Sequence, residues 1–197
     1  MKKLQDTVVA IVGLGLIGGS YAKALKSQKV KRIIGMDRNH IVSLMALDEG
    51  YVTELADEDP ELLREADVII CCMYPGAFVP FVKDHVRYFK KNVLLTDVMG
   101  IKGSIPDQVD ALLGPEMDFV PTHPMAGREG KGYSQSTSQI FQGAFPDCHI
   151  SSSCCFSLWV SMHFQKPWPM NWAVPGWWNC RWRNMTASSP TPAICPM

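Results

Sequence analysis

The sequence predicts an α/β protein built on a doubly wound parallel sheet. Apolar runs of strand length recur through the first 120 residues, segments with helical periodicity separate them, and the first run ends in a glycine-rich turn. Strands and helices that alternate in this way form parallel strands joined by right-handed crossovers. The expected strands cover residues 8–12, 32–36, 68–72, 93–96 and 118–120.

The segment Thr7–Ser20, with the sequence TVVAIVGLGLIGGS, opens this pattern. Its five-residue apolar run suits a strand buried on both faces. The glycines Gly13, Gly15 and Gly18 then follow the G-x-G-x-x-G spacing, which allows a sharp turn, a close approach of backbone to pyrophosphate and tight packing of the next helix. This predicts a Rossmann-type dinucleotide site. A glycine-rich turn without a ligand is the alternative.

The helix after the glycines should run to about Ser27, and its first residues, Leu16 and Ile17, should present N–H groups to phosphate. The next strand should end at Asp37, about twenty residues after the glycines. An acid there accepts hydrogen bonds from ribose hydroxyls and repels a 2′-phosphate, which favours NAD over NADP. Neighbouring Arg38 leaves NADP possible, and the alternative role of Asp37 is a cap for the following helix.

The next two helices are predicted from their apolar faces and end signals. One should carry Ile41, Leu44 and Met45 on one face and stop at Gly50. A short helix should follow, with Asp59 as its cap and a proline in its first turn.

The strand at residues 68–72 should end where Tyr74, Pro75 and Gly76 break it, at the sheet edge where a cofactor would lie. Cys71 and Cys72 show no metal-ligand spacing, so they are interpreted as small apolar residues of this strand and no metal site is expected. A helix with apolar residues at 79, 82, 86 and 89 should follow, and a later one at 105, 109 and 112.

Three segments in order, GLGLIGGS, TDVMGIKG and THPMAGRE, resemble the prephenate dehydrogenase family of tyrosine biosynthesis over about residues 5–145. The resemblance implies that NAD oxidises prephenate with loss of its ring carboxylate, giving 4-hydroxyphenylpyruvate and carbon dioxide. An arogenate dehydrogenase-like enzyme, or an NAD-binding module without catalysis, are the alternatives.

The resemblance also implies that His123 accepts or hydrogen-bonds the proton of the ring hydroxyl. Histidine suits that role because imidazole titrates near neutrality, although a structural histidine is the alternative. Lys102 could steady a substrate carboxylate or could be solvated on a helix. Gly100 stands where many relatives have a serine, so a hydroxyl contact cannot be carried over.

The composition changes near residue 148. All nineteen acids lie at or before Asp147, and all six tryptophans lie at or after Trp159. Residues 1–150 carry sixteen Lys and Arg against nineteen acids, a net charge of −3, whereas the remainder carries three bases and no acid. We therefore expect a nucleotide-binding domain at 1–147 and, at 148–197, an aberrant and unstructured tail in place of the family's helical dimerisation domain.

A base lost near codon 150 would explain this change. In the shifted frame, residues 170–173 must encode Glu-Leu-Gly and residues 177–180 must encode Val-Glu-Leu. Residues 184–197 permit His-Asp-Arg-Ile-Ile-Ala-Tyr-Thr-Ser-His-Leu-Pro-His, which resembles the start of the family's helical domain. The hypothesis is a frameshifted prephenate dehydrogenase gene, whose product would have little activity.

No secretory leader opens the chain and no apolar run reaches membrane-spanning length, so a cytoplasmic location is expected. The expected partner is a small-molecule substrate, prephenate, with neither nucleic acid nor membrane. A homodimer is expected for the full-length family.

Overall fold

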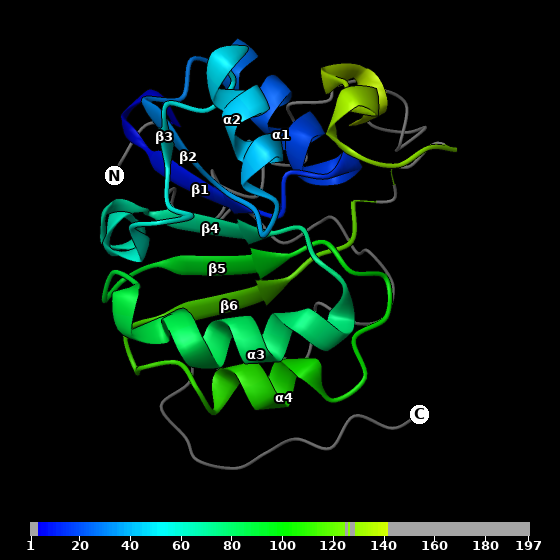
Figure 1. The fold of residues 1–197 in the computed structure, drawn as a ribbon. Coiled ribbons are helices and arrows are strands. Elements are labelled where there is room, and N and C mark those ends of the chain that lie inside the picture. Colours follow the sequence, from blue (N-terminus) through cyan, green and yellow to red (C-terminus); the bar gives the residue numbers. More distant parts are fainter. Residues whose placement is uncertain (1–3, 125, 127–128, 142–197) are drawn as a thin grey trace, which may run out of the picture. The chain divides into compact units, whose positions relative to one another are not determined.

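The computed structural model describes residues 4–124, 126 and 129–141. A six-stranded, wholly parallel sheet forms its centre, with strand order β3-β2-β1-β4-β5-β6 (Figure 1). The strands are β1 (Val8–Val12), β2 (Arg32–Met36), β3 (Glu54–Leu55), β4 (Val68–Cys71), β5 (Leu94–Asp97) and β6 (Asp118–Pro121). The predicted α/β class and Rossmann-type topology are confirmed. The two-residue strand β3 was not predicted.

Among the described residues, α1 and α2 cover one face of the sheet and α3 and α4 cover the other (Figure 1). The helices are α1 (Leu16–Ser27), α2 (His40–Asp48), α3 (Pro75–His85) and α4 (Ile105–Asp110). Short 3-10 helices lie at Leu4–Asp6, Pro60–Glu65, Val86–Tyr88, Tyr133–Gln135 and Ser138–Phe141. The predicted cap of the second of these is confirmed, because Asp59 accepts a hydrogen bond from the Glu61 N–H at 3.2 Å.

The central strand β1 is buried on both faces, as its continuous apolar run predicts. Val9 and Ile11 belong to the core that also contains side chains of α1 and α2. Ala10 and Val12 belong to the opposite core, which contains side chains of α3 and α4. Successive residues of a strand point to opposite faces, so one short strand serves both cores.

The three apolar residues predicted to share one face of α2 do so, and that face points to solvent. Ile41, Leu44 and Met45 are 67%, 45% and 39% exposed, whereas Ser43 and Ala46 are fully buried. The helix packs directly against β2. Small side chains allow that close approach, and the larger apolar side chains at this spacing therefore face outward.

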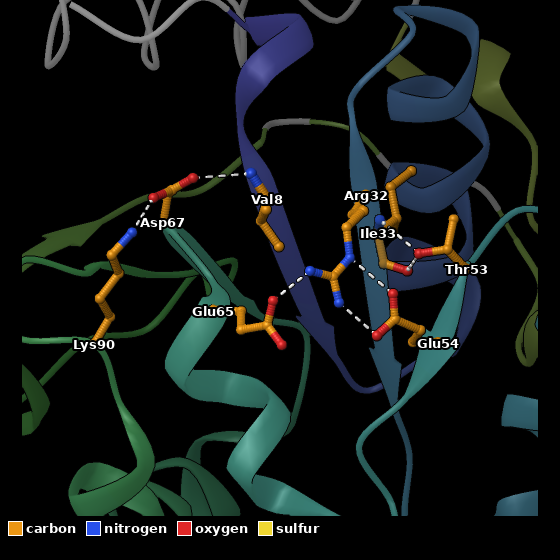
Figure 2. Close-up of polar contacts among 8 residues, drawn as sticks. All are labelled: Val8, Arg32, Ile33, Thr53, Glu54, Glu65, Asp67 and Lys90. Carbon is orange, nitrogen blue, oxygen red and sulfur yellow. Dashed lines mark hydrogen bonds and ion pairs between the residues drawn. The ribbon is translucent and has the colours of Figure 1, made fainter.

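Ion pairs join several elements at the amino edge of the sheet (Figure 2). Arg32, the first residue of β2, donates from Nε to Glu54 of β3 at 2.7 Å and also bonds Glu65, the last residue of the second 3-10 helix. These bonds hold the guanidinium protonated and raise the pKa of Arg32. The contact fixes β2, β3 and the segment leading to β4 relative to one another.

Asp67 makes a second contact at this edge, directly before β4 (Figure 2). Its side chain is 8% exposed. One carboxylate oxygen accepts the Val8 N–H at 3.0 Å and the other accepts Lys90 Nζ at 2.6 Å. A buried carboxylate needs such partners, and here they connect the start of β1 to the segment before β5.

Within the described residues, no helix combines the length and the apolar character needed to cross a bilayer. The same residues bring together no group of three side chains suited to hold a metal ion. The tail at 148–197 and its frameshift interpretation lie outside the described part of the chain.

Candidate active site

Two glycines of the first turn are required by the fold itself. Gly13 has φ +91°, and a Cβ there would lie 2.4 Å from the carbonyl oxygen of Cys72. A Cβ on Gly18 would lie 1.9 Å from the carbonyl oxygen of Gly13. The turn therefore packs backbone against backbone, between β1, the start of α1 and the end of β4.

Gly15 is different, because a Cβ there would meet no protein atom within 4 Å. The residue is the N-cap of α1, and no side chain caps the helix. The first N–H groups of a helix have no intrahelical partner, so those beginning around Leu16 and Ile17 can bond an anion. Open space beside an uncapped helix start fits a pyrophosphate.

Asp37 follows β2 and is bonded to this turn. One carboxylate oxygen accepts the Leu14 N–H at 2.7 Å, and the other accepts the Asn39 N–H at 2.9 Å. The cap of α2 is Asn39, whose side chain accepts the Ile41 N–H at 3.3 Å, so Asp37 itself is not the helix cap. Arg38 is exposed and makes no polar contact in the described part of the chain.

Tyr74 and Pro75 lie where β4 ends and α3 begins. Tyr74 is the residue before the helix and is 84% exposed, and Pro75 is its first residue and is also exposed. Cys71 is buried and Cys72 partly so, and burial raises the pKa of both thiols. Each packs in one of the two hydrophobic cores, as expected of small apolar residues.

A polar network joins the carboxyl ends of β5 and β6. Asp97, the last residue of β5, is fully buried and accepts the Thr122 N–H at 3.2 Å, the Met99 N–H at 3.1 Å and Lys102 Nζ. Lys102 Nζ also donates to the Thr122 carbonyl at 2.6 Å. Burial lowers the pKa of Lys102, and the bond to Asp97 opposes that shift.

His123 comes directly after this network and is exposed. Its ring lies beside Gly100, where an added Cβ would stand 3.2 Å from both Cε1 and Nε2. Glycine therefore leaves room for the ring. Lys102, by contrast, lies before α4 rather than on it, and its side chain is only 24% exposed.

The carboxyl ends of the strands thus bring the predicted site residues to one edge of the sheet. Asp37 follows β2 and His123 follows β6, four strand spacings away in the order β2-β1-β4-β5-β6. At about 4.8 Å per spacing this is about 19 Å. The glycine turn lies between, where β1 neighbours β4 and the strand order reverses, which is the usual ligand position in such sheets.

The sequence did not single out three polar residues of this edge. Asp97 and Thr122 form the network described above, and Asp57 accepts the Asp37 N–H at 2.9 Å and contacts His40 Nδ1 at 2.8 Å. A polar residue at the carboxyl end of a buried strand was the available signal for Asp97. The partners of Asp57 are set by the fold and had no local signal.

Comparisons with known proteins identify the family of this chain. The family model "Prephenate dehydrogenase, nucleotide-binding domain" matches residues 21–146. The prephenate dehydrogenase of Bacillus subtilis is 34% identical over 147 residues, which are 74% of this chain and 39% of that protein. This chain therefore spans well under two thirds of that relative's length.

Solved structures of dehydrogenases have a similar fold. The prephenate dehydrogenase of A. aeolicus, in complex with hydroxyphenyl propionate and NAD+, has a TM-score of 0.64 and 28% identity, over 72% of this chain and 50% of that one. The arogenate dehydrogenase of Synechocystis has a TM-score of 0.62 and 26% identity, over 68% of this chain and 46% of that one. The chain belongs to the prephenate dehydrogenase family and carries its nucleotide-binding domain.

Proposed function

We propose that this chain binds NAD at the glycine turn and provides the cofactor half of a prephenate dehydrogenase. The observation that carries the proposal is the placement of an exposed His123 on the same sheet edge as the uncapped start of α1. A dinucleotide lying across the β1–β4 junction would have one end near Asp37 and could bring the other toward His123. Bound NAD would supply the hydride acceptor.

The role proposed for each site residue follows from its position at the carboxyl edge of the sheet. The N–H groups at the start of α1 hold the pyrophosphate, and Gly15 leaves space for it. Asp37 accepts from the adenosine ribose. His123 takes the proton of the ring hydroxyl of prephenate as the ring carbon that bears this hydroxyl is oxidised. Carbon dioxide then leaves and the ring becomes aromatic. Tyr74 and Pro75 border the cofactor at the end of β4.

A preference for NAD over NADP follows from Asp37. Its carboxylate stands at the end of β2 and is held by two backbone N–H groups, so a 2′-phosphate would be forced against a fixed negative charge. Calorimetric titration of the full chain with both cofactors tests this. We expect tighter binding of NAD, and Asp37→Ala should narrow the preference. Tighter binding of NADP by the unchanged chain would contradict the assignment.

The low activity expected of the chain as written is a second part of the proposal. Hydride transfer needs the reacting carbon and its acceptor aligned at about 3 to 3.5 Å in a site closed to water, and such alignment supplies about 7 to 11 kcal/mol. We propose that residues 148–197 are a frameshifted reading that lacks the closing half. Restoring one base near codon 150 should then produce prephenate-dependent NADH formation. Strong activity from the unchanged chain would refute this.

The catalytic role of His123 is tested in the restored protein. His123→Asn should lower kcat about a hundredfold or more and leave the affinity for NAD nearly unchanged, because removal of a general base affects the chemical step. His85→Asn is a suitable control, since His85 lies at the end of α3 and contacts the Phe81 carbonyl. An active His123→Asn enzyme would remove His123 from the mechanism.

Arogenate is the second candidate substrate, favoured by the likeness to the Synechocystis arogenate dehydrogenase. Comparing turnover of prephenate and arogenate by the restored protein distinguishes the two. The homodimer and the cytoplasmic location stay predictions.

A further inference from the structure

Thr122 is the residue directly before His123, and each of its polar groups makes a hydrogen bond. Its N–H donates to Asp97 Oδ1 at 3.2 Å and its hydroxyl donates to the Asp97 carbonyl. Its own carbonyl accepts Lys102 Nζ at 2.6 Å. The backbone that enters His123 is therefore fixed to the end of β5.

The loop beneath the His123 ring is fixed by the same carboxylate. Asp97 Oδ2 accepts the Met99 N–H at 3.1 Å and also bonds Lys102, so both ends of the short loop that contains Gly100 are tied to it. Gly100 is the residue that the His123 ring approaches. One buried carboxylate thus sets both the backbone before the imidazole and the surface on which the ring lies.

We propose that Asp97 and Lys102 are positioning residues that hold His123 in place, and that Lys102 works inside the protein rather than on a substrate carboxylate. The inference rests on the proposed role of His123. It refines the expectation for Lys102, which the sequence left open between substrate contact and a solvated surface position.

The environment of Lys102 supports a role within the protein. Its ammonium already donates to two oxygens, one of them on a carboxylate with no solvent exposure. Without the ammonium, Asp97 would keep its backbone donors but lose its only cationic partner among the described residues. A buried carboxylate that loses its cation is strongly destabilised, so the network around Thr122 should loosen. A lysine that waits for substrate would instead be exposed and unpaired.

The test compares Lys102→Met with Lys91→Met in the full chain. Lys91 is an exposed lysine that makes no polar contact in the described part of the chain, so it is a matched control. Circular dichroism verifies that each variant folds. Solvent exchange of the Thr122 amide is then measured by NMR, together with the ¹³Cε1 resonance of His123, which His123→Asn identifies among the five histidines.

We expect Lys102→Met to speed exchange at Thr122 about tenfold or more and to move or broaden the His123 resonance. Lys91→Met should change neither. Asp97→Asn should also move or broaden the His123 resonance, although Lys102 is still present. The N–H₂ group of the new asparagine would face hydrogen-bond donors where the carboxylate offered an acceptor. An unchanged His123 resonance in either folded variant of the network would overturn the proposal.

One measurement does not depend on whether a variant folds. In the unchanged protein the Thr122 amide must exchange slowly for a half-buried residue outside the strands, and fast exchange there would also overturn the proposal. If Lys102 bound substrate instead, Lys102→Met would weaken binding of hydroxyphenyl propionate by the restored protein while His123 kept its resonance. None of these readouts uses turnover, so an active His123→Asn enzyme would refute the proposed function and leave this network intact.

Discussion

Substituting the glycines of the first turn should separate cofactor binding from folding. Gly15→Ala adds a methyl group that meets no protein atom within 4 Å, at a residue whose φ of −72° any amino acid can adopt. Its free energy of unfolding should fall by at most about 1 kcal/mol, the cost of a poorer helix cap. The affinity for NAD should fall tenfold or more, because the methyl group occupies the space proposed for the pyrophosphate.

Gly18→Ala should instead act mainly on the free energy of unfolding. Its methyl group would lie 1.9 Å from the Gly13 carbonyl oxygen, so α1 must move by more than 1 Å to reach an ordinary contact. Overpacking of this kind costs about 3 kcal/mol at the upper end of its range, and alanine returns about 1 kcal/mol as a better helix former. The net loss should be about 2 kcal/mol, or roughly 4 to 8 °C in Tm.

The assay is urea unfolding followed by circular dichroism, because every tryptophan lies at or after Trp159 and the described residues contain none. Gly76→Ala, at an exposed position in the first turn of α3 with open space around it, is the control for the stability measurement. Calorimetry then gives the affinity for NAD. A Gly15→Ala protein that binds NAD normally, or a Gly18→Ala protein as stable as the control, would refute the reasoning.

Two further predictions concern stability. Asp67→Ala removes the acceptor of the Val8 N–H and the partner of Lys90, whose side chain is 35% exposed. We expect the free energy of unfolding in urea to fall by about 2 to 3 kcal/mol, and the affinity for NAD to stay unchanged. Burial and the bond to Glu49 raise the pKa of Tyr133, so the folded chain keeps the phenol proton after the unfolded chain has lost it. That contribution to stability is complete below about pH 10 and declines above it. Tyr133→Phe should be less stable at pH 7 and should lose less stability between pH 9 and 11, and an identical alkaline decline in both proteins would contradict this.

The sheet was predictable because its signals are local. Continuous apolar runs such as Val8–Val12 occur where a strand is buried on both faces, and the glycine spacing identifies one particular strand-to-helix turn. The carboxyl edge then followed from parallel topology alone. Placing Asp37 and His123 on one edge needed no knowledge of side-chain contacts, only the order of strands along the chain.

The face of α2 could not be predicted, because apolar residues occur around much of this helix. The choice of face depends on the space above β2, where a Cβ on Gly35 would already lie 3.1 Å from Leu14 and from Val52. Only small residues such as Ser43 fit against a layer that is so closely packed. The hydrogen bonds around Asp97 could not be predicted either, since Thr122 lies 25 residues away and no local pattern connects the two.

The two edges of the sheet differ in a way that explains why the stability and binding predictions can be separated. At the amino edge, charged groups such as Arg32 and Asp67 are paired, and their bonds fix the starts of the strands. At the carboxyl edge, the start of α1 has no side-chain cap and Tyr74 and His123 are exposed. These groups have few partners within the described residues, whereas Asp97 beneath them is fully bonded. A change at the amino edge therefore alters the free energy of unfolding without reaching the ligand. The reverse holds for Gly15. At the buried network around Asp97, beneath the exposed groups of the carboxyl edge, a substitution should affect both the free energy of unfolding and ligand binding.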